Sequence, residues 1–334
     1  MSNPDQQIKT ALQDLADEAG PPRIEVDDAW RTGRRRTRFA TITSAVAVAT
    51  AISAGLLTVL PGARDAHEHT IRTVAYVLDR AARTAGRSGQ PLPHSGQYIA
   101  VTSLARSMTE EMSGSQAARA WLTLERRKIW WSVSNRKPGL GWYDAVRNDR
   151  LPWSGPGATT PLGVSWLPIP AQGCADAPPV RFTYQFLTTL PTEPAKLRAW
   201  IYSHKDGGQS ADDQAWTDIS DLLGTMLTPP RLTAALFRVA ATIPGATVVP
   251  HVTDAAGRSG VAVARVIQGA TQNDELIFNT STYRLLGGRT ELNVSEPGLG
   301  PPGTVIQAWA LLHKTVVSHL PRHAHGHGRT ASHC

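Results

Sequence analysis

The chain has 334 residues, 41% of them hydrophobic and 18% charged, a balance that supports a folded core and excludes a largely disordered protein. The formal net charge of +7 comes mostly from one arginine cluster before residue 39, so a folded nucleic-acid-binding face is not expected. The two cysteines, Cys174 and Cys334, have neither CxxC nor Cys/His spacing. A structural zinc site is therefore not predicted, and whether the cysteines pair stays open.

A long apolar run lies near the N-terminus. Residues 39–60, FATITSAVAVATAISAGLLTVL, are 22 residues without a charge. As an α-helix this run would be about 33 Å long, enough to cross the hydrocarbon core of a bilayer. A buried core helix of this length would carry a polar stripe, and a cleaved signal peptide usually has a shorter apolar region. We therefore predict a transmembrane helix, although the small residues Ala51, Ser53 and Ala54 leave cleavage open.

Positive charge gathers on one side of this run. The preceding residues include Arg31, Arg34, Arg35, Arg36 and Arg38, and the 15 residues after it contain only Arg64 and Arg72. Because cytoplasmic flanks carry the excess of Lys and Arg, this predicts a single-pass plasma-membrane protein with its N-terminus inside and its remainder outside the cell. Residues 1–38 would form a cytoplasmic tail. Its short amphipathic pattern suits either docking of a cytoplasmic regulator or a tail that only sets topology.

Hydrophobic periodicity predicts the elements that follow the anchor. An extracytoplasmic helix over 65–84 is expected within a linker segment, 61–96, because Ile71, Val74 and Leu78 share one face. Alternating side chains then predict strands at 98–103, 122–125 and 129–134. Residues 135–180 are rich in Gly and Pro, which predicts long loops with irregular strands, and 180–187 predicts another strand.

Helices and then further strands complete the predicted domain, 97–318. Helices are expected from about Thr192 to Ile201, Asp212 to Leu227 and Pro229 to Pro244. Strands are expected at 248–253, 261–267, 275–278, 283–286 and 290–294, with Gly287-Gly288 as a break. Residues 304–317 are interpreted as a last strand, with a helix as the alternative. This order predicts an α+β fold, in which helices pack on one face of a curved antiparallel sheet. Residues 319–334 contain five histidines and predict a disordered tail.

No motif in the sequence singles out a catalytic centre. A Gly-rich phosphate loop, HExxH and GxSxG are all missing from the sequence, so neither an enzyme nor a bound cofactor or metal is predicted. The adjacent Asp274 and Glu275 would point to opposite faces of a strand and so would not act as a paired acid and base. A hydrolase stays an alternative if His94, His204 or His251 meets a serine or carboxylate in a pocket.

Tryptophan is unusually frequent, with 10 residues in the chain. Amphipathic aromatic side chains suit a membrane interface or an apolar ligand, but they are also ordinary sheet-core residues. Trp130 and Trp131 must face opposite sides of a strand, so one of the pair is expected in the core. The predicted ligand-contacting residues are Trp130, Trp131, Trp142, Trp153 and Trp166.

Four sequence blocks carry a family resemblance: LPTEPAKLRAWIYS (190–203), PPRLTAALFRVAATIPGATVV (229–249), DAAGRSGVAVAR (254–265) and ELIFNTSTYRLLGGR (275–289). In this order, behind an arginine-flanked anchor, they resemble an actinobacterial family of single-pass membrane-anchored proteins of unassigned activity, often encoded beside extracytoplasmic-function sigma factors. The resemblance covers about residues 30–320. Asn279 departs from the family pattern, which has an aspartate near this position, and the change is expected to affect mainly turn chemistry.

That family is in turn similar to the half-barrel fold of lipoprotein carriers and of periplasmic regulators of sigma-factor signalling. The resemblance implies binding and not catalysis, although fold analogy alone does not establish function. The leading hypothesis is a membrane-anchored extracytoplasmic binding or sensing protein, which takes a lipid or an envelope protein in a cleft between sheet and helices. An envelope hydrolase and a purely structural envelope protein are the alternatives.

Overall fold

The structure is a computed structural model that describes residues 62–89, 92–113, 116–154, 160–171, 183–203, 210–267 and 271–321. The predicted cytoplasmic tail with Arg34, Arg35, Arg36 and Arg38, the predicted transmembrane helix, both cysteines and most of the histidine-rich tail lie outside these residues. Within them, no helix is long and apolar enough to span a membrane. The anchor and its orientation therefore stay predictions.

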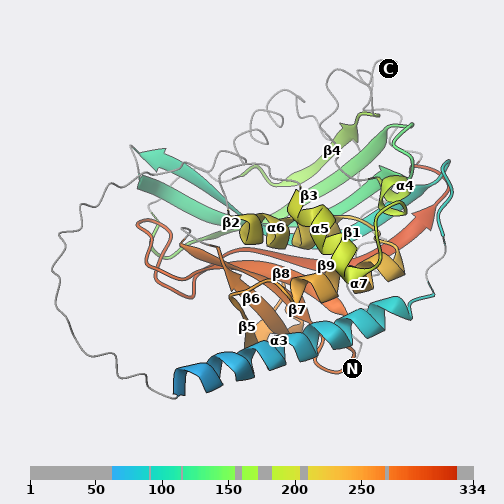
Figure 1. Ribbon diagram of the computed structural model, residues 1–334. Helices are drawn as coiled ribbons and strands as arrows, with labels where there is room; N and C mark the ends of the chain where they lie inside the picture. Colours follow the sequence, from blue (N-terminus) through green and yellow to red (C-terminus); the bar gives the residue numbers. More distant parts are fainter. Residues whose placement is uncertain are drawn as a thin grey trace, which may run out of the picture.

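A single antiparallel sheet of nine strands organises the described part of the chain, in the order β4-β3-β2-β1-β9-β8-β7-β6-β5 (Figure 1). The strands are β1 (Tyr98–Ser113), β2 (Gln116–Ser132), β3 (Gly139–Arg150), β4 (Gly163–Ile169), β5 (Ala246–Thr253), β6 (Ser259–Val266), β7 (Gln272–Phe278), β8 (Leu285–Leu292) and β9 (Val305–Val317). Two meanders, β1–β4 and β5–β9, join where β1 pairs with β9. The predicted antiparallel α+β class is confirmed.

Helices α4 (Tyr184–Leu187), α5 (Pro194–Ser203), α6 (Ala211–Thr225) and α7 (Pro230–Ala240) lie between the two meanders in sequence, and α3 (Gly62–Gly86) precedes β1. Each of the three longest inter-meander helices matches a predicted helix within a few residues. Together with α3 they bury one shared core against the sheet, whose members include Leu78, Leu197, Trp216, Leu222, Leu232, Leu236, Leu276 and Phe278. Apolar side chains at helical spacing thus meet the alternating apolar face of the strands.

Two strand predictions were wrong, and a third was too coarse. Residues 135–180, predicted as long loops with irregular strands, contain the regular strands β3 and β4, which are paired through Trp142 and Trp166. The predicted strand over 180–187 is, in its described part, the short helix α4, because Thr183 caps it by accepting a hydrogen bond from the Phe186 amide. The predicted break at Gly287-Gly288 lies inside β8.

The two glycines of β8 make room for one tryptophan. A Cβ at Gly288 would lie 2.5 Å from the Glu275 carbonyl oxygen and 2.8 Å from Trp309 Nε1. The Trp309 ring also reaches α6, where a Cβ at Gly224 would lie 3.3 Å from it. The missing side chains therefore leave room for Trp309 between sheet and helix, and the strand continues past them.

Helix α3 is fastened to the turn between β7 and β8. Asn279 organises this turn, because its Oδ1 accepts hydrogen bonds from the backbone amides of Ser281 and Thr282 at 3.0 and 2.8 Å. Thr84 of α3 then donates to the Thr282 carbonyl at 2.8 Å. The expectation that Asn279 serves turn chemistry is confirmed, and this turn holds the helix that follows the predicted anchor.

Candidate functional site

The structure separates the five predicted tryptophans. Trp130, Trp142 and Trp166 belong to one cluster that contains no helix residue, whereas Trp131 packs toward the helical core. Trp130 and Trp166 stack with centroids 6.2 Å apart and ring planes at 17°. Trp153 lies after β3 and is 51% exposed, with its ring against the backbone of Gly300. The expectation that Trp130 and Trp131 face opposite sides of their strand is confirmed.

The tryptophan cluster on the sheet face away from the helices leaves little ring surface for a ligand. Trp130 is 6% exposed and Trp142 is 7% exposed. Lys128 covers the Trp130 ring, with its Nζ 5.2 Å from the ring centroid, and burial lowers the pKa of this lysine. Ligand binding by these residues stays a prediction, and their geometry is that of a packed cluster.

The space between sheet and helices is filled by side chains. Leu197, Ile219 and Leu236, from three different helices, are fully buried there against Leu276 and Phe278 of the sheet. Phe237 meets Phe278 edge-on, with centroids 5.5 Å apart. The expected apolar cleft between the sheet and the helices at 193–243 is thus occupied by the described core itself, and ligand contacts must be sought at the surface.

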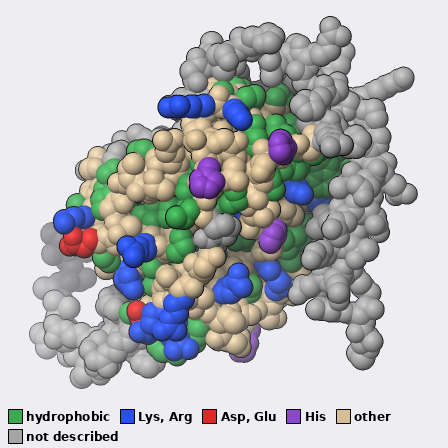
Figure 2. Space-filling model, turned by 90° about the vertical axis from the view of Figure 1, so that its right-hand side faces the viewer, with side chains coloured by type: hydrophobic (Ala, Val, Ile, Leu, Met, Phe, Trp, Pro, Cys, Tyr) green, Lys and Arg blue, Asp and Glu red, His purple; other side chains and the backbone are tan. Residues whose placement is uncertain are grey.

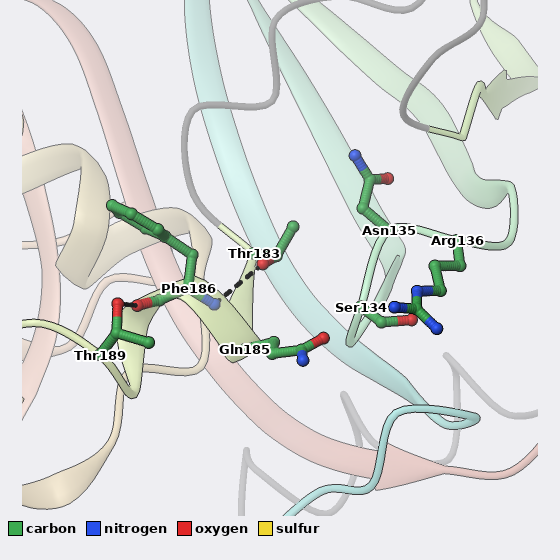
Figure 3. A pocket seen from close by; sticks show the side chains of 7 residues that line it. All are labelled: Ser134, Asn135, Arg136, Thr183, Gln185, Phe186 and Thr189. Carbon is green, nitrogen blue, oxygen red and sulfur yellow. Dashed lines mark hydrogen bonds between the residues drawn. The ribbon is translucent and has the colours of Figure 1, made fainter.

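A surface pocket of about 510 Å³ opens between the β2–β3 turn and α4 (Figure 3). We call it the proximal pocket, because it lies at the end of the sheet where β1 begins and β2 ends. Its lining comes from two chain segments nearly fifty residues apart and consists of Ser134, Asn135, Arg136, Thr183, Gln185, Phe186 and Thr189. These residues combine hydroxyl and amide groups, one guanidinium and one aromatic ring.

Backbone hydrogen bonds hold the two sides of the proximal pocket together. The Gln185 amide donates to the Val133 carbonyl at 3.2 Å, which joins α4 to the end of β2. Asn135 adopts a left-handed backbone with φ of 54°, a conformation that Asn tolerates better than most residues, and this reverses the chain after β2. The Ser134 hydroxyl donates to the Ser95 carbonyl at 2.9 Å and fixes the turn against the segment before β1.

A hydrogen-bond inventory shows which groups of the proximal pocket stay available. The hydroxyls of Ser134 and Thr189 donate to backbone carbonyls, and Thr183 Oγ1 accepts from the Phe186 amide. The side-chain amides of Asn135 and Gln185 make no hydrogen bond to the described residues, and the Arg136 guanidinium makes none either. The Thr183 hydroxyl keeps its own proton, so the free groups are mainly donors. Figure 3 shows Arg136 and Gln185 on opposite sides of the pocket.

The proximal end of the sheet carries positive charge. The four described segments that meet there, 92–98, 132–139, 183–190 and 316–321, contain Arg136, Lys137 and two histidines but no Asp or Glu. Figure 2 views the side where α4 and the ends of β9 and α3 lie, and Lys and Arg clearly outnumber Asp and Glu on it. A negatively charged partner would therefore be attracted to this end of the molecule.

A second pocket of about 460 Å³ lies beside a buried ion pair between sheet and helix. Its lining includes Ser210 and Asp212 at the start of α6, and Arg265 of β6. Arg265 pairs with Asp213 and also donates from Nε to the Pro244 carbonyl at 3.1 Å. Because these contacts tie the guanidinium to the fold, this arrangement fastens α6 to the sheet.

The described residues do not bring together the side chains that a hydrolase would need. His94 and His251 are exposed and line neither pocket, and His204 lies outside the described residues. Within the described part of the chain, no three His, Cys, Asp or Glu side chains gather in a way that could hold a metal ion. The burial of Asp274 raises its pKa, but the carboxylate accepts a hydrogen bond from the neighbouring Thr290 hydroxyl at 2.9 Å.

Neither a protein-family model nor a curated protein sequence matches the chain. Among solved structures, that of the Pseudomonas aeruginosa MucA/MucB complex is similar, with 12% sequence identity and a TM-score of 0.24. The match covers 75% of this chain and 59% of that chain, so the chain spans less than two thirds of its length. A likeness at this TM-score carries no argument about fold or function. The resemblance to the actinobacterial family stays a prediction.

Sequence reasoning missed the residues of the proximal pocket. The Ser-Asn-Arg-Lys-Pro-Gly run at 134–139 is a recognisable turn signal. Nothing in the sequence pairs that turn with Thr183 and Gln185, because α4 was predicted as a strand. The pocket depends on a contact between distant segments that periodicity does not reveal.

Proposed function

We propose that this chain is a non-enzymatic, membrane-anchored binding protein whose folded domain lies outside the plasma membrane. The predicted anchor at 39–60, with its arginine cluster on one flank, supports the location. The proximal pocket is the observation that carries the binding role, because it is open, lined by free hydrogen-bonding groups and flanked by an aromatic ring. In this proposal the domain senses or holds an envelope component at that pocket.

The location is tested separately from the binding. Alkaline phosphatase, which is active only outside the cytoplasm, is fused after Cys334 of the full chain, and a cytoplasmic reporter is fused at the same point as its counterpart. We expect phosphatase activity, and we expect extraction of the chain from membranes to require detergent. Activity of the cytoplasmic reporter alone would contradict the proposed topology.

The binding role is tested by what the full chain retains. The protein is purified in mild detergent, and native mass spectrometry measures any molecule that stays bound. Gln185→Trp places an indole in the proximal pocket, and Gln307→Trp is the control, since Gln307 is exposed on β9 away from both pockets. We expect the wild type and the control to carry the same bound molecule and the Gln185→Trp variant to lack it.

A structural envelope protein is the second candidate function. The packed core between sheet and helices favours it, because buried side chains of both layers meet there. In that case no molecule co-purifies with any variant, and filling the proximal pocket has no effect. A bound molecule that survives Gln185→Trp would instead place the binding site elsewhere on the domain.

A further inference from the structure

We infer that the proximal pocket takes an anionic ligand with a phosphate-type group, bound by the Arg136 guanidinium, and with an apolar portion against Phe186. This inference rests on the proposed binding function and names the chemical class of its ligand. It is argued from charge, hydrogen-bonding capacity and the aromatic rim.

Arg136 has no carboxylate partner among the described residues, and among the described arginines it alone lines the proximal pocket. Arginines with a carboxylate within ion-pair distance include Arg83, Arg106, Arg119, Arg126, Arg127, Arg147, Arg258, Arg265 and Arg289. Arg136 is exposed at the mouth of a concave site, with Lys137 beside it and no acidic residue in the lining. A guanidinium is suited to bidentate recognition of phosphate and carboxylate oxygens.

The uncharged groups of the proximal pocket favour the same ligand. The Gln185 amide and the Thr183 hydroxyl supply donors, while no carboxylate lines the pocket to repel an anion. A phosphate group offers several acceptor oxygens and would use donors from both sides of the pocket. A neutral polyol would leave the guanidinium without a matching charge, so it should bind more weakly.

The aromatic rim indicates that the ligand extends beyond its anionic group. Phe186 is 38% exposed, and its ring lies 6.1 Å from that of Trp200 at a 50° tilt. Phe186 and Arg136 line the same pocket, and a partly exposed aromatic ring in a pocket with a cation suits a ligand that is charged at one end and apolar at the other. A phospholipid headgroup with its first acyl carbons and a soluble organic phosphate share this chemistry.

The test uses the full chain in detergent micelles at low ionic strength, with binding measured by isothermal titration calorimetry. The probes are glycerol 3-phosphate with glycerol as its neutral counterpart, and dihexanoyl-phosphatidylglycerol with dihexanoyl-phosphatidylcholine. We expect one or both net anionic probes to bind and their counterparts to bind at least about tenfold more weakly. Binding of phosphatidylglycerol alone identifies a lipid as the source, and binding of glycerol 3-phosphate alone identifies a soluble phosphate.

Matched arginine variants distinguish a specific anion site from nonspecific electrostatic attraction. Arg136→Ala should weaken anion binding about tenfold or more, whereas Arg136→Lys should restore only part of it because the bidentate geometry is lost. Arg231→Ala is the control, since Arg231 is exposed on α7 outside the pocket and has no ion pair among the described residues. Equal loss in Arg136→Ala and Arg231→Ala, or no loss in either, would overturn the inference.

The two proposals fail in different ways. If a molecule co-purifies and is lost in Gln185→Trp, but no anionic probe binds, the binding function stands and the anionic class is overturned. If nothing co-purifies and no probe binds, both are overturned. Unchanged unfolding midpoints in urea for the three arginine variants, all at exposed positions, exclude a folding defect as the cause of any loss.

Discussion

Tyr283 meets Tyr76 edge-on, with ring centroids 5.9 Å apart and ring planes at 87°. The Arg80 guanidinium lies 5.3 Å from the centroid of the same Tyr283 ring, so two residues of α3 converge on it. Tyr283 has φ of 57°, a left-handed conformation that costs a non-glycine residue about 1–2 kcal/mol. The turn that Asn279 organises thus holds a strained residue in contact with the helix that follows the predicted anchor.

Replacement of Tyr283 by Ala should loosen α3 without unfolding the sheet. The variant keeps the unfavourable backbone conformation and loses both ring contacts, which together are worth about 1 kcal/mol or more. Amide hydrogen exchange over 74–86 should then be roughly five- to tenfold faster, as measured by mass spectrometry on the full chain. Tyr283→Phe keeps the ring and should change exchange about twofold at most. Equal exchange in Tyr283→Ala and the wild type would show that the apolar stripe alone holds α3.

The buried pair of Arg265 and Asp213 predicts a large stability loss on substitution. Asp213 is fully buried, and Arg265→Met would leave its carboxylate without the guanidinium, which typically costs about 3–5 kcal/mol. The control is Arg83→Met, whose pair with Asp79 on α3 is solvent-exposed and should be worth less than about 1 kcal/mol. Urea unfolding of the full chain measures both.

A double variant checks the physical cause of that loss. Asp213→Asn combined with Arg265→Met removes both charges, so the stability should recover in part relative to Arg265→Met alone. If the double variant is as unstable as the sum of the two single ones, the loss comes from packing and not from an unpaired charge.

The sequence predicted the order of elements and most of the helices because these depend on local pattern. The buried stripe of α7 includes Leu232, Leu236 and Val239, at the spacing of one helix face, and Pro230 occupies the first helical turn. The last element was interpreted as a strand with a helix as the alternative, and β9 confirms the strand. Where a face of an element is buried along its whole length, periodicity is a sufficient guide.

Errors arose where tertiary contacts override local signals. Gly287 and Gly288 look like a strand break, but they continue β8 because the backbone and ring of Trp309 occupy the space of their side chains. The Gly-rich start of β3 was taken as a loop, although Gly139 allows close approach to the Trp130 carbonyl oxygen, 2.5 Å from where a Cβ would stand. The proximal pocket could not be foreseen for the same reason, since it joins the β2–β3 turn to α4.

Replacing Trp130 and Trp153, two of the predicted ligand-contacting tryptophans, by Ala should cause very different losses of folding stability. Trp130 is buried in a stack with Trp166, so Trp130→Ala should destabilise the domain by about 3–5 kcal/mol. Trp153 is about half exposed, and Trp153→Ala should cost less than about 1.5 kcal/mol. The two values come from urea unfolding of the full chain. A small loss for Trp130→Ala would argue that the cluster is a binding surface and not a core.

Lys314 of β9 brings a charged group beneath the end of α6. Its Nζ donates to the carbonyl oxygen of Leu223 at 2.8 Å and to that of Met226, two groups that the helix leaves unpaired at its C-terminus. The side chain as a whole is half-buried, but its ammonium group is removed from water, and this desolvation lowers the pKa of Lys314 to about 7 from 10.5. Near neutral pH, keeping Lys314 charged in the folded protein therefore reduces its stability.

The lowered pKa of Lys314 predicts that the protein becomes more stable as the pH rises from 7 toward 10.5. Between the folded and the unfolded pKa the unfolded chain binds more protons, so the free energy of unfolding increases with pH, and below about pH 7 the dependence ends. From pH 7 to pH 9 the gain should be on the order of 2 kcal/mol. Urea unfolding at both values, with Lys314→Met as the comparison, measures it. The variant should lose that gain, and an equal gain in both proteins would assign the pH dependence to other groups.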